Sequence, residues 1–247
     1  MPLLHLALAQ FRPRKGDLEG NLRRIGEVLA QASSLDPRPQ VVQFPETALS
    51  GYFVEGGVHE LALTAGDLAR RLASAFEAAA PGAAPLDVVI GFYERFEGDL
   101  HNSLMYVRVG CTTSSDRAAG ECEIVHVHRK NFLPTYGMFD EERFVERRYG
   151  VRAFDAPWGR AAMLICEDAW HSLTGLIAAL DGAHVIFVSS AAPARGTVER
   201  AAGDSVPGPV ARGGGGIRVI GAVPGVFVAV GSLVGRVGGT VVQGAAR

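Results

Sequence analysis

Short apolar runs separated by polar or glycine-rich stretches recur along most of this 247-residue chain. Runs of this kind indicate buried strands. We expect strands over residues 3–9, 40–44, 86–92, 103–109, 122–128, 161–165, 184–189 and 226–231. Helical patterns separate several of them, but residues 86–128 hold consecutive strands with no helix between them. The pattern predicts an α/β fold of the α+β type, with mixed and partly antiparallel sheets.

Three segments carry apolar residues at helical spacing. The apolar faces of the first two are formed by Leu22, Ile25, Val28 and Leu29 in residues 21–32, and by Leu68, Leu72 and Phe76 in residues 67–80. The third segment covers about 171–181. The polar stretch Asp99–Asn102 predicts a hairpin turn, and Cys111–Gly120 predicts an exposed loop.

Composition limits the classes of protein to consider. A chain of 247 residues, 48% of them hydrophobic, can bury one sizeable core, so we expect a single domain over residues 1–247. A net charge of −2 gives no argument for a nucleic-acid or membrane partner. Three cysteines, no signal-peptide pattern and no long apolar stretch favour a reducing compartment, and we expect a cytoplasmic protein.

The first candidate for chemistry is Cys166, which directly follows the strand-like run 161–165. Enzymes with α/β folds present reactive groups at the carboxyl ends of strands. Glu167 and Asp168 come directly behind the thiol. The simpler alternative is a buried cysteine acting as a small apolar residue, followed by two acidic residues at a helix start.

Two more strand ends carry charged residues. The run 40–44 leads to Glu46, and the run 122–128 leads to Lys130. A carboxylate can take a thiol proton and later activate water, and an ammonium favours a thiolate and stabilises an oxyanion. Should the three strands lie side by side in one direction, these groups converge at one rim. The alternatives are a helix cap for Glu46 and a surface position for Lys130.

The segments around these residues resemble a known family. Phe44–Tyr52, His128–Pro134 and Leu164–Trp170 resemble the three signature segments of the nitrilase (carbon–nitrogen hydrolase) superfamily. Lys130–Phe144 is most similar to the glutamine-amidase domain of glutamine-dependent NAD synthetases. The resemblance covers residues 3–194 and implies an α-β-β-α sandwich, which usually pairs with a second copy in a homodimer or larger homo-oligomer.

The resemblance also implies roles for individual residues. Glu46 is expected to be the general base, Lys130 the cation that stabilises the oxyanion, and Cys166 the nucleophile. Glu141 is expected to orient Lys130, with Glu142 as a close rival. The pocket is expected to include Tyr52, Phe139 and Glu167; for the two aromatic residues the alternative is core packing, and for Glu167 it is capping of the next turn.

We expect no metal and no cofactor. His126 and His128 share one face of a strand, but no third ligand has suitable spacing. Gly213–Gly216 lacks the lysine and hydroxyl of a phosphate-binding loop. This glycine run ends the Pro-, Gly-, Ala- and Arg-rich residues 193–216, which have the composition of a flexible loop or a linker.

The C-terminal part departs from the family pattern. Residues 195–225 differ from it, a partial family-like strand follows at 226–234, and the end of the chain is atypical or truncated. A divergent loop or a disturbed reading frame would each produce this. Either one affects the far wall of the pocket and the pairing surface, and leaves Glu46, Lys130 and Cys166 untouched.

The sequence thus predicts a cofactor-free thiol amidohydrolase that forms an acyl-enzyme on Cys166. The expected substrate is a small carboxamide, with glutamine as the leading candidate, and the released ammonia would serve a separate synthetase or none. Three alternatives stay open: an ω-amidase or carbamoyl hydrolase, a catalytically impaired homologue that binds a synthetase, and a papain-like Cys–His pair.

Overall fold

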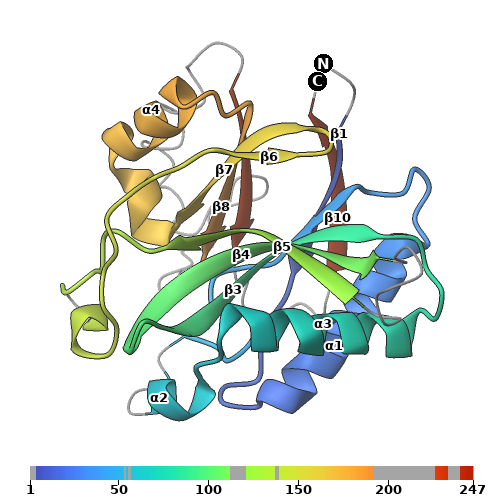
Figure 1. Cartoon of the computed structure of the whole chain (residues 1–247), viewed down its shortest axis with the longest axis horizontal. Helices are drawn as coiled ribbons and strands as arrows, with labels where there is room; N and C mark the ends of the chain where they lie inside the picture. Colours follow the sequence, from blue (N-terminus) through green and yellow to red (C-terminus); the bar gives the residue numbers. More distant parts are fainter. Residues whose placement is uncertain are drawn as a thin grey trace, which may run out of the picture.

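The strands form two sheets that face each other, with helices on both outer faces (Figure 1). The structure is a computed structural model, and it describes residues 4–52, 54, 57–111, 121–136, 139–191, 226–232 and 240–246. The first sheet has the strand order β10-β1-β2-β3-β4-β5, and the second has the order β6-β7-β8-β9. This arrangement confirms the predicted α-β-β-α sandwich with mixed sheets.

The first sheet contains β1 (Leu4–Gln10), β2 (Val41–Gln43), β3 (Leu86–Phe96), β4 (Asp99–Cys111), β5 (Glu121–Arg129) and β10 (Thr240–Ala246). The second contains β6 (Phe154–Ala156), β7 (Gly159–Ile165), β8 (Val185–Ser190) and β9 (Phe227–Ser232). The α-helices are α1 (Leu18–Ser33), α2 (Val58–Leu61), α3 (Ala65–Ala79) and α4 (Ser172–Leu180). Two 3-10 helices near the site are η2 (Glu141–Arg143) and η3 (Cys166–Trp170).

Alternation along the strands produces the layers. On β7, Met163 and Ile165 point into the core between the sheets, while Ala162 and Leu164 point outward beneath α4. The outer face of the first sheet packs against α1 and α3, whose buried residues include the predicted Ile25 and Phe76. The apolar pattern therefore fixes which face of each element is buried.

Most predicted elements are present, but the predicted turn is wrong. Residues 99–102 belong to β4, and the hairpin turns instead at Glu97 and Gly98, between the paired residues Phe96 and Asp99. Both turn residues have positive φ, 53° and 95°, as a two-residue turn between twisted antiparallel strands requires. The short β6, α2 and the strand β10 were not predicted.

The topology explains how distant strand ends meet. β2 runs parallel to β3, and two antiparallel steps through β4 leave β5 running in the same direction as β2. Glu46 and Lys130 therefore follow strands that end at the same edge of the first sheet. The three strands are not neighbours, however: β3 and β4 lie between β2 and β5, and Cys166 follows β7 of the second sheet.

Several predictions fall on residues that the structure does not describe. They are the loop at 112–120, the divergent residues 195–225 with Gly213–Gly216, and positions 233 and 234 of the family-like strand. The rest of that strand is β9. Within the described residues, no helix is long and apolar enough to cross a membrane.

Candidate active site

Glu46 lies on a tight loop directly after β2 and is buried. The next residue, Thr47, has a φ of 47°, which is rare for a residue with a branched side chain. The loop crosses β3 at Gly91, where an added Cβ would lie 2.5 Å from the amide nitrogen of Thr47 and 2.7 Å from Cα of Glu46. Only a residue without a side chain permits this approach, so Gly91 determines where Glu46 sits.

Lys130 follows β5, and its side chain is fully buried. Its Nζ donates to Oε1 of Glu46 and to Oε2 of Glu141, each at 2.7 Å. Burial disfavours the ammonium, but the two carboxylates outweigh it and hold the pKa of Lys130 well above its usual value. The alternative of a surface lysine is therefore wrong.

Glu141 begins the 3-10 helix η2 and is buried, whereas Glu142 is exposed. The structure thus places Glu141, and not its rival, against Lys130. Burial raises the pKa of Glu141, and the charge of Lys130 opposes that rise. Two carboxylates and one ammonium share this enclosed space.

A residue that the sequence analysis did not single out completes the cluster. Asn102, on β4, donates from Nδ2 to Oε1 of Glu46 at 2.8 Å and to Oε1 of Glu141 at 2.6 Å. The sequence pattern predicts a turn at Asn102, whereas the residue lies in a buried strand. The one sequence feature that could have pointed to a buried role for Asn102 is its position directly before the apolar run 103–109.

Cys166 begins η3 at the end of β7, with a φ of 44°. This strained backbone turns the chain sharply away from the sheet. The hydroxyl of Ser190 donates to Sγ at 3.4 Å. Burial and the charge of Glu46 raise the pKa of the thiol to about 12, while Lys130 acts in the opposite direction. These influences together favour the neutral thiol over the thiolate.

Asp168 joins the two strand ends and was also missed as a structural link. Its Oδ1 accepts the backbone N–H groups of Asn131 and Phe132, each at 3.0 Å, directly after Lys130. Its Oδ2 accepts the N–H of Ile165 at 3.2 Å and Nε2 of His128 at 2.9 Å. One fully buried carboxylate thus connects the segment that carries Lys130 with the turn that carries Cys166.

The end of β8 makes a second connection between the sheets. The hydroxyl of Ser189 donates to the carbonyl of Phe44 at 2.8 Å, and the N–H of Ala191 donates to Oε2 of Glu46 at 2.8 Å. Between them, Ser190 contacts Cys166. Three consecutive residues therefore hold the Glu46 loop on one side and the thiol on the other.

The three predicted pocket residues lie beside this cluster. The rings of Tyr52 and Phe139 meet edge to face at 6.2 Å, and Nζ of Lys130 lies 5.9 Å from the ring centre of Tyr52. The hydroxyl of Tyr136 donates to Oε2 of Glu167 at 2.7 Å, and its ring contacts Phe139. An aromatic wall with one anchored carboxylate therefore adjoins the buried charges.

The histidine pair does not form a metal site with its neighbours. His126 stacks on Phe154 with ring centres 4.8 Å apart, and burial lowers its pKa to about 4. His128 bonds Asp168. Within the part of the chain that the structure describes, no group of three His, Cys, Asp or Glu side chains is placed to hold a metal.

Comparison with known proteins gives a consistent result. Residues 5–206 match the family described as carbon-nitrogen hydrolase. The glutamine-dependent NAD(+) synthetase of Aquifex aeolicus is 29% identical over 194 residues, covering 77% of this chain and 30% of that protein. Its counterpart from Thermotoga maritima is 30% identical over 195 residues, covering 78% and 31%. The chain thus spans about a third of the length of these curated relatives.

Solved structures agree. The glutamine-dependent NAD+ synthetase of Acinetobacter baumannii matches with a TM-score of 0.60 and 26% identity, covering 78% of this chain and 33% of that one. An amidase of the nitrilase superfamily from Nesterenkonia matches with a TM-score of 0.69 and 20% identity, covering 97% and 82%. The second likeness supports the fold.

Proposed function

The chain belongs to the carbon–nitrogen hydrolase family, and on this premise we propose that it is a thiol amidohydrolase that cleaves a small carboxamide. The observation that carries the proposal is the buried cluster of Glu46, Lys130 and Glu141 beside a thiol on a strained turn. The cluster supplies a base and a fixed cation, and the thiol supplies a nucleophile.

In the proposed acylation, Glu46 takes the proton of Cys166 while Sγ attacks the carbonyl carbon of the amide. A carboxylate offers about four lone-pair positions, and Lys130, Asn102 and Ala191 occupy three of them. The free position is on Oε2, where the proton binds. Lys130 and the backbone N–H after the cysteine stabilise the oxyanion. The carbon–nitrogen bond then breaks, and ammonia leaves with the proton from Glu46.

Deacylation repeats the same steps with water. Glu46 removes a proton from a water molecule, whose oxygen attacks the thioester carbon. The carbon–sulfur bond breaks, the proton returns to sulfur, and the carboxylic acid leaves. Glu141 stays ionised beside Lys130 throughout, so the ammonium keeps a partner when Glu46 is protonated.

Glutamine is the substrate that we propose first. The curated relatives are glutamine-dependent enzymes, and Glu167 presents a carboxylate next to the nucleophile, held by Tyr136. A carboxylate in this position favours a substrate with an amino group. The ammonia would serve a separate or attached synthetase. An ω-amidase or carbamoyl hydrolase with another substrate remains the alternative.

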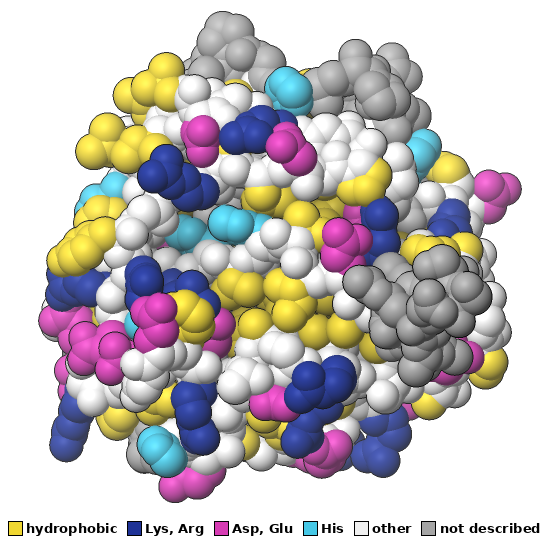
Figure 2. All heavy atoms as spheres, in the orientation of Figure 1, with side chains coloured by type: hydrophobic (Ala, Val, Ile, Leu, Met, Phe, Trp, Pro, Cys, Tyr) yellow, Lys and Arg dark blue, Asp and Glu magenta, His cyan; other side chains and the backbone are white. Residues whose placement is uncertain are grey.

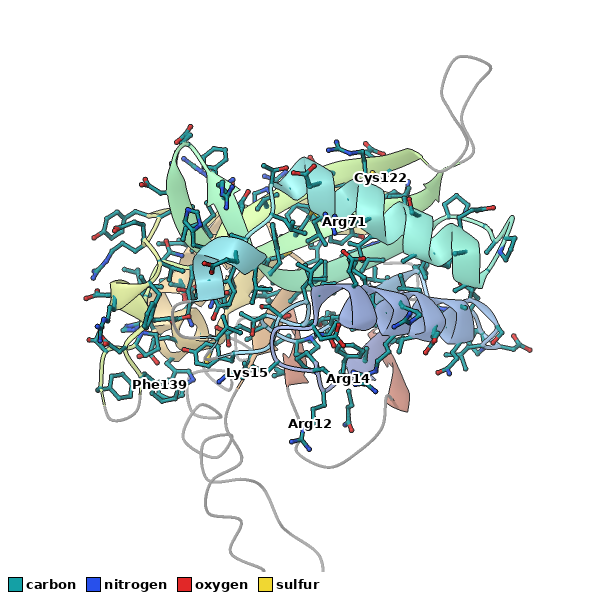
Figure 3. All side chains as sticks on the ribbon, turned by 90° about the horizontal axis from the view of Figure 1, so that it is seen from below. Arg12, Arg14, Lys15, Arg71, Cys122 and Phe139 are labelled. Atoms are coloured by element: carbon teal, nitrogen blue, oxygen red, sulfur yellow. The ribbon has the colours of Figure 1, made fainter. Side chains whose placement is uncertain are left out.

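The test measures ammonia release from glutamine and a panel of simple amides. Cys166→Ala should abolish release, while Cys122→Ala should retain it, because Cys122 packs against the core under α1 and α3 and lies well away from Phe139 (Figure 3). Intact mass should show an acyl adduct that is lost in Cys166→Ala and accumulates in Glu46→Gln. Equal turnover in wild type and Cys166→Ala would exclude this nucleophile. A folded wild type inactive on every amide would favour the impaired, synthetase-binding alternative.

We also propose that two copies pair through α4. This helix contains no charged residue, and Leu173, Leu176, Ile177 and Leu180 are exposed on it. Figure 2 shows apolar side chains gathered where α4 lies. An exposed apolar stripe of this kind marks an association surface. Leu176→Glu should convert a dimer to a monomer in sedimentation equilibrium. Tyr149→Glu, which changes an exposed aromatic side chain outside α4, should leave the dimer intact. A monomeric wild type would contradict the proposal.

A further inference from the structure

We propose that Asn102 is a positioning residue that holds Glu46 and Glu141 against Lys130 and keeps Glu141 ionised without adding charge. The inference rests on the proposed thiol amidase function. It concerns a residue that neither touches the substrate in that mechanism nor belongs to the three family segments.

The contacts of Asn102 form a closed ring. Lys130 and Asn102 each donate to Oε1 of Glu46, and they divide the oxygens of Glu141, Lys130 binding Oε2 and Asn102 binding Oε1. The backbone also takes part, because the carbonyl of Asn102 accepts the N–H of Lys130 at 2.9 Å. Asn102 is therefore bonded to all three charged residues of the cluster.

Chemistry fixes the orientation of the amide. Rotation by half a turn would bring Oδ1 against the oxygens of two carboxylates, so the nitrogen must face them. Oδ1 has no hydrogen-bond partner among the described residues. A buried acceptor without a partner costs free energy. That Oδ1 is nevertheless left unpaired indicates that the bonds from Nδ2 to Glu46 and Glu141 outweigh this cost.

The side chain of Asn102 is uncharged, which preserves the basicity that the proposed mechanism requires of Glu46. Two carboxylates and one ammonium leave the cluster with an excess negative charge, which repels within a medium of low dielectric constant. A second cation would cancel the excess but would lower the basicity of Glu46, which must accept the thiol proton. Asn102 supplies two donors and leaves the charge unchanged.

The central experiment compares Asn102→Leu with Ser103→Ala. Leucine has a similar shape and removes both donors. Ser103 is the adjacent buried residue on the opposite face of β4, where it bonds Glu94, so its variant loses a buried hydrogen bond outside the cluster. We expect Asn102→Leu to lower kcat for amide hydrolysis about 100-fold, with KM little changed, and Ser103→Ala to keep the wild-type kcat per folded molecule. Equal kcat in the two variants would overturn the inference.

A second measurement needs no activity. Loss of the Asn102 donors should raise the pKa of Glu141 further in the folded state. The folded variant then binds more protons than the folded wild type, so its unfolding midpoint in urea falls further below that of wild type as pH rises. The groups that act electrostatically on Glu141 or respond to it are the same in both proteins: Glu46, Lys130, Tyr52, Tyr93 and Cys166.

The outcomes separate the two proposals. A deficit in the midpoint of Asn102→Leu that is independent of pH would contradict the role of Asn102 even in an inactive protein. An inactive wild type with the expected pH dependence would contradict only the amidase proposal. Should Asn102→Leu fail to fold, Asn102→Ser replaces it: its single O–H donor predicts an intermediate kcat and the same direction of pH dependence, and a wild-type result in both measurements would overturn the inference.

Discussion

The two sides of the site are built differently. On the side of the first sheet, Glu46, Asn102, Lys130 and Glu141 are buried and joined by four short hydrogen bonds between their side chains. On the side of the second sheet, the thiol of Cys166 has one described hydrogen bond, from Ser190, and sits on a strained turn. The charged side is held by hydrogen bonds among its own side chains, and the thiol side is held mainly by its links to the charged side.

Those links are few and specific. Asp168 connects the turn of Cys166 to the residues after Lys130, and Ala191 connects the end of β8 to Glu46. In the proposed mechanism the two sides have different tasks: one sets the electrostatic field, and the other presents the reacting atom. Substitutions on the two sides should therefore fail in different ways.

The largest effect is expected from Lys130→Met. It leaves two buried carboxylates without their cation, and loss of one partner of a buried ion pair costs about 3–5 kcal/mol. Turnover should vanish, and urea denaturation should show the loss of stability at neutral pH. The loss should shrink as pH falls, because protonation neutralises the carboxylates. Lys15→Met, at an exposed lysine, serves as control. If Lys130→Met lowered turnover and stability as little as Lys15→Met does, the charged cluster would not hold this side of the site together.

Asp168→Asn should have the next largest effect. The amide keeps one acceptor oxygen and loses the other, so at least one buried backbone N–H is left unpaired, at a cost of about 1–3 kcal/mol. The charged cluster should persist while Cys166 loses its alignment with it, so kcat should fall more than stability predicts. Urea unfolding and ammonia release measure the two parts. A kcat that fell only with the folded fraction would show that Asp168 does not align the two sides.

The smallest and most local effect concerns the thiol. The charge of Glu46 helps to raise the pKa of Cys166 to about 12, so Glu46→Gln should lower that pKa and increase the thiolate fraction between neutral and mildly alkaline pH. Thiolate absorbance in the ultraviolet, corrected with Cys166→Ala, measures it. Glu142→Gln, at an exposed carboxylate, should leave the titration unchanged. An unchanged thiol pKa in Glu46→Gln would show that the two sides are not electrostatically coupled.

The sequence predicted more of the layers than of the site. Apolar runs located β1–β5 and β7–β9 because burial on one or both faces is a local property of the pattern. Strand order and the packing of one sheet on the other depend on residues far apart in the sequence, so the apolar runs could not show how the strands before Glu46, Lys130 and Cys166 are arranged. Asn102 and Asp168 were missed as links because a polar residue shows its buried partners only after the chain has folded.

The bond between Ala191 and Glu46 also has a consequence for the timing of synthesis. These residues are 145 positions apart, and a ribosome adds about 5–20 residues per second. The Glu46 loop therefore leaves the ribosome on the order of ten seconds before its partner exists. During that interval the nascent chain carries a carboxylate that is buried in the folded protein but is still in water, and the bond from Ala191 to Glu46 cannot form until β8 has emerged.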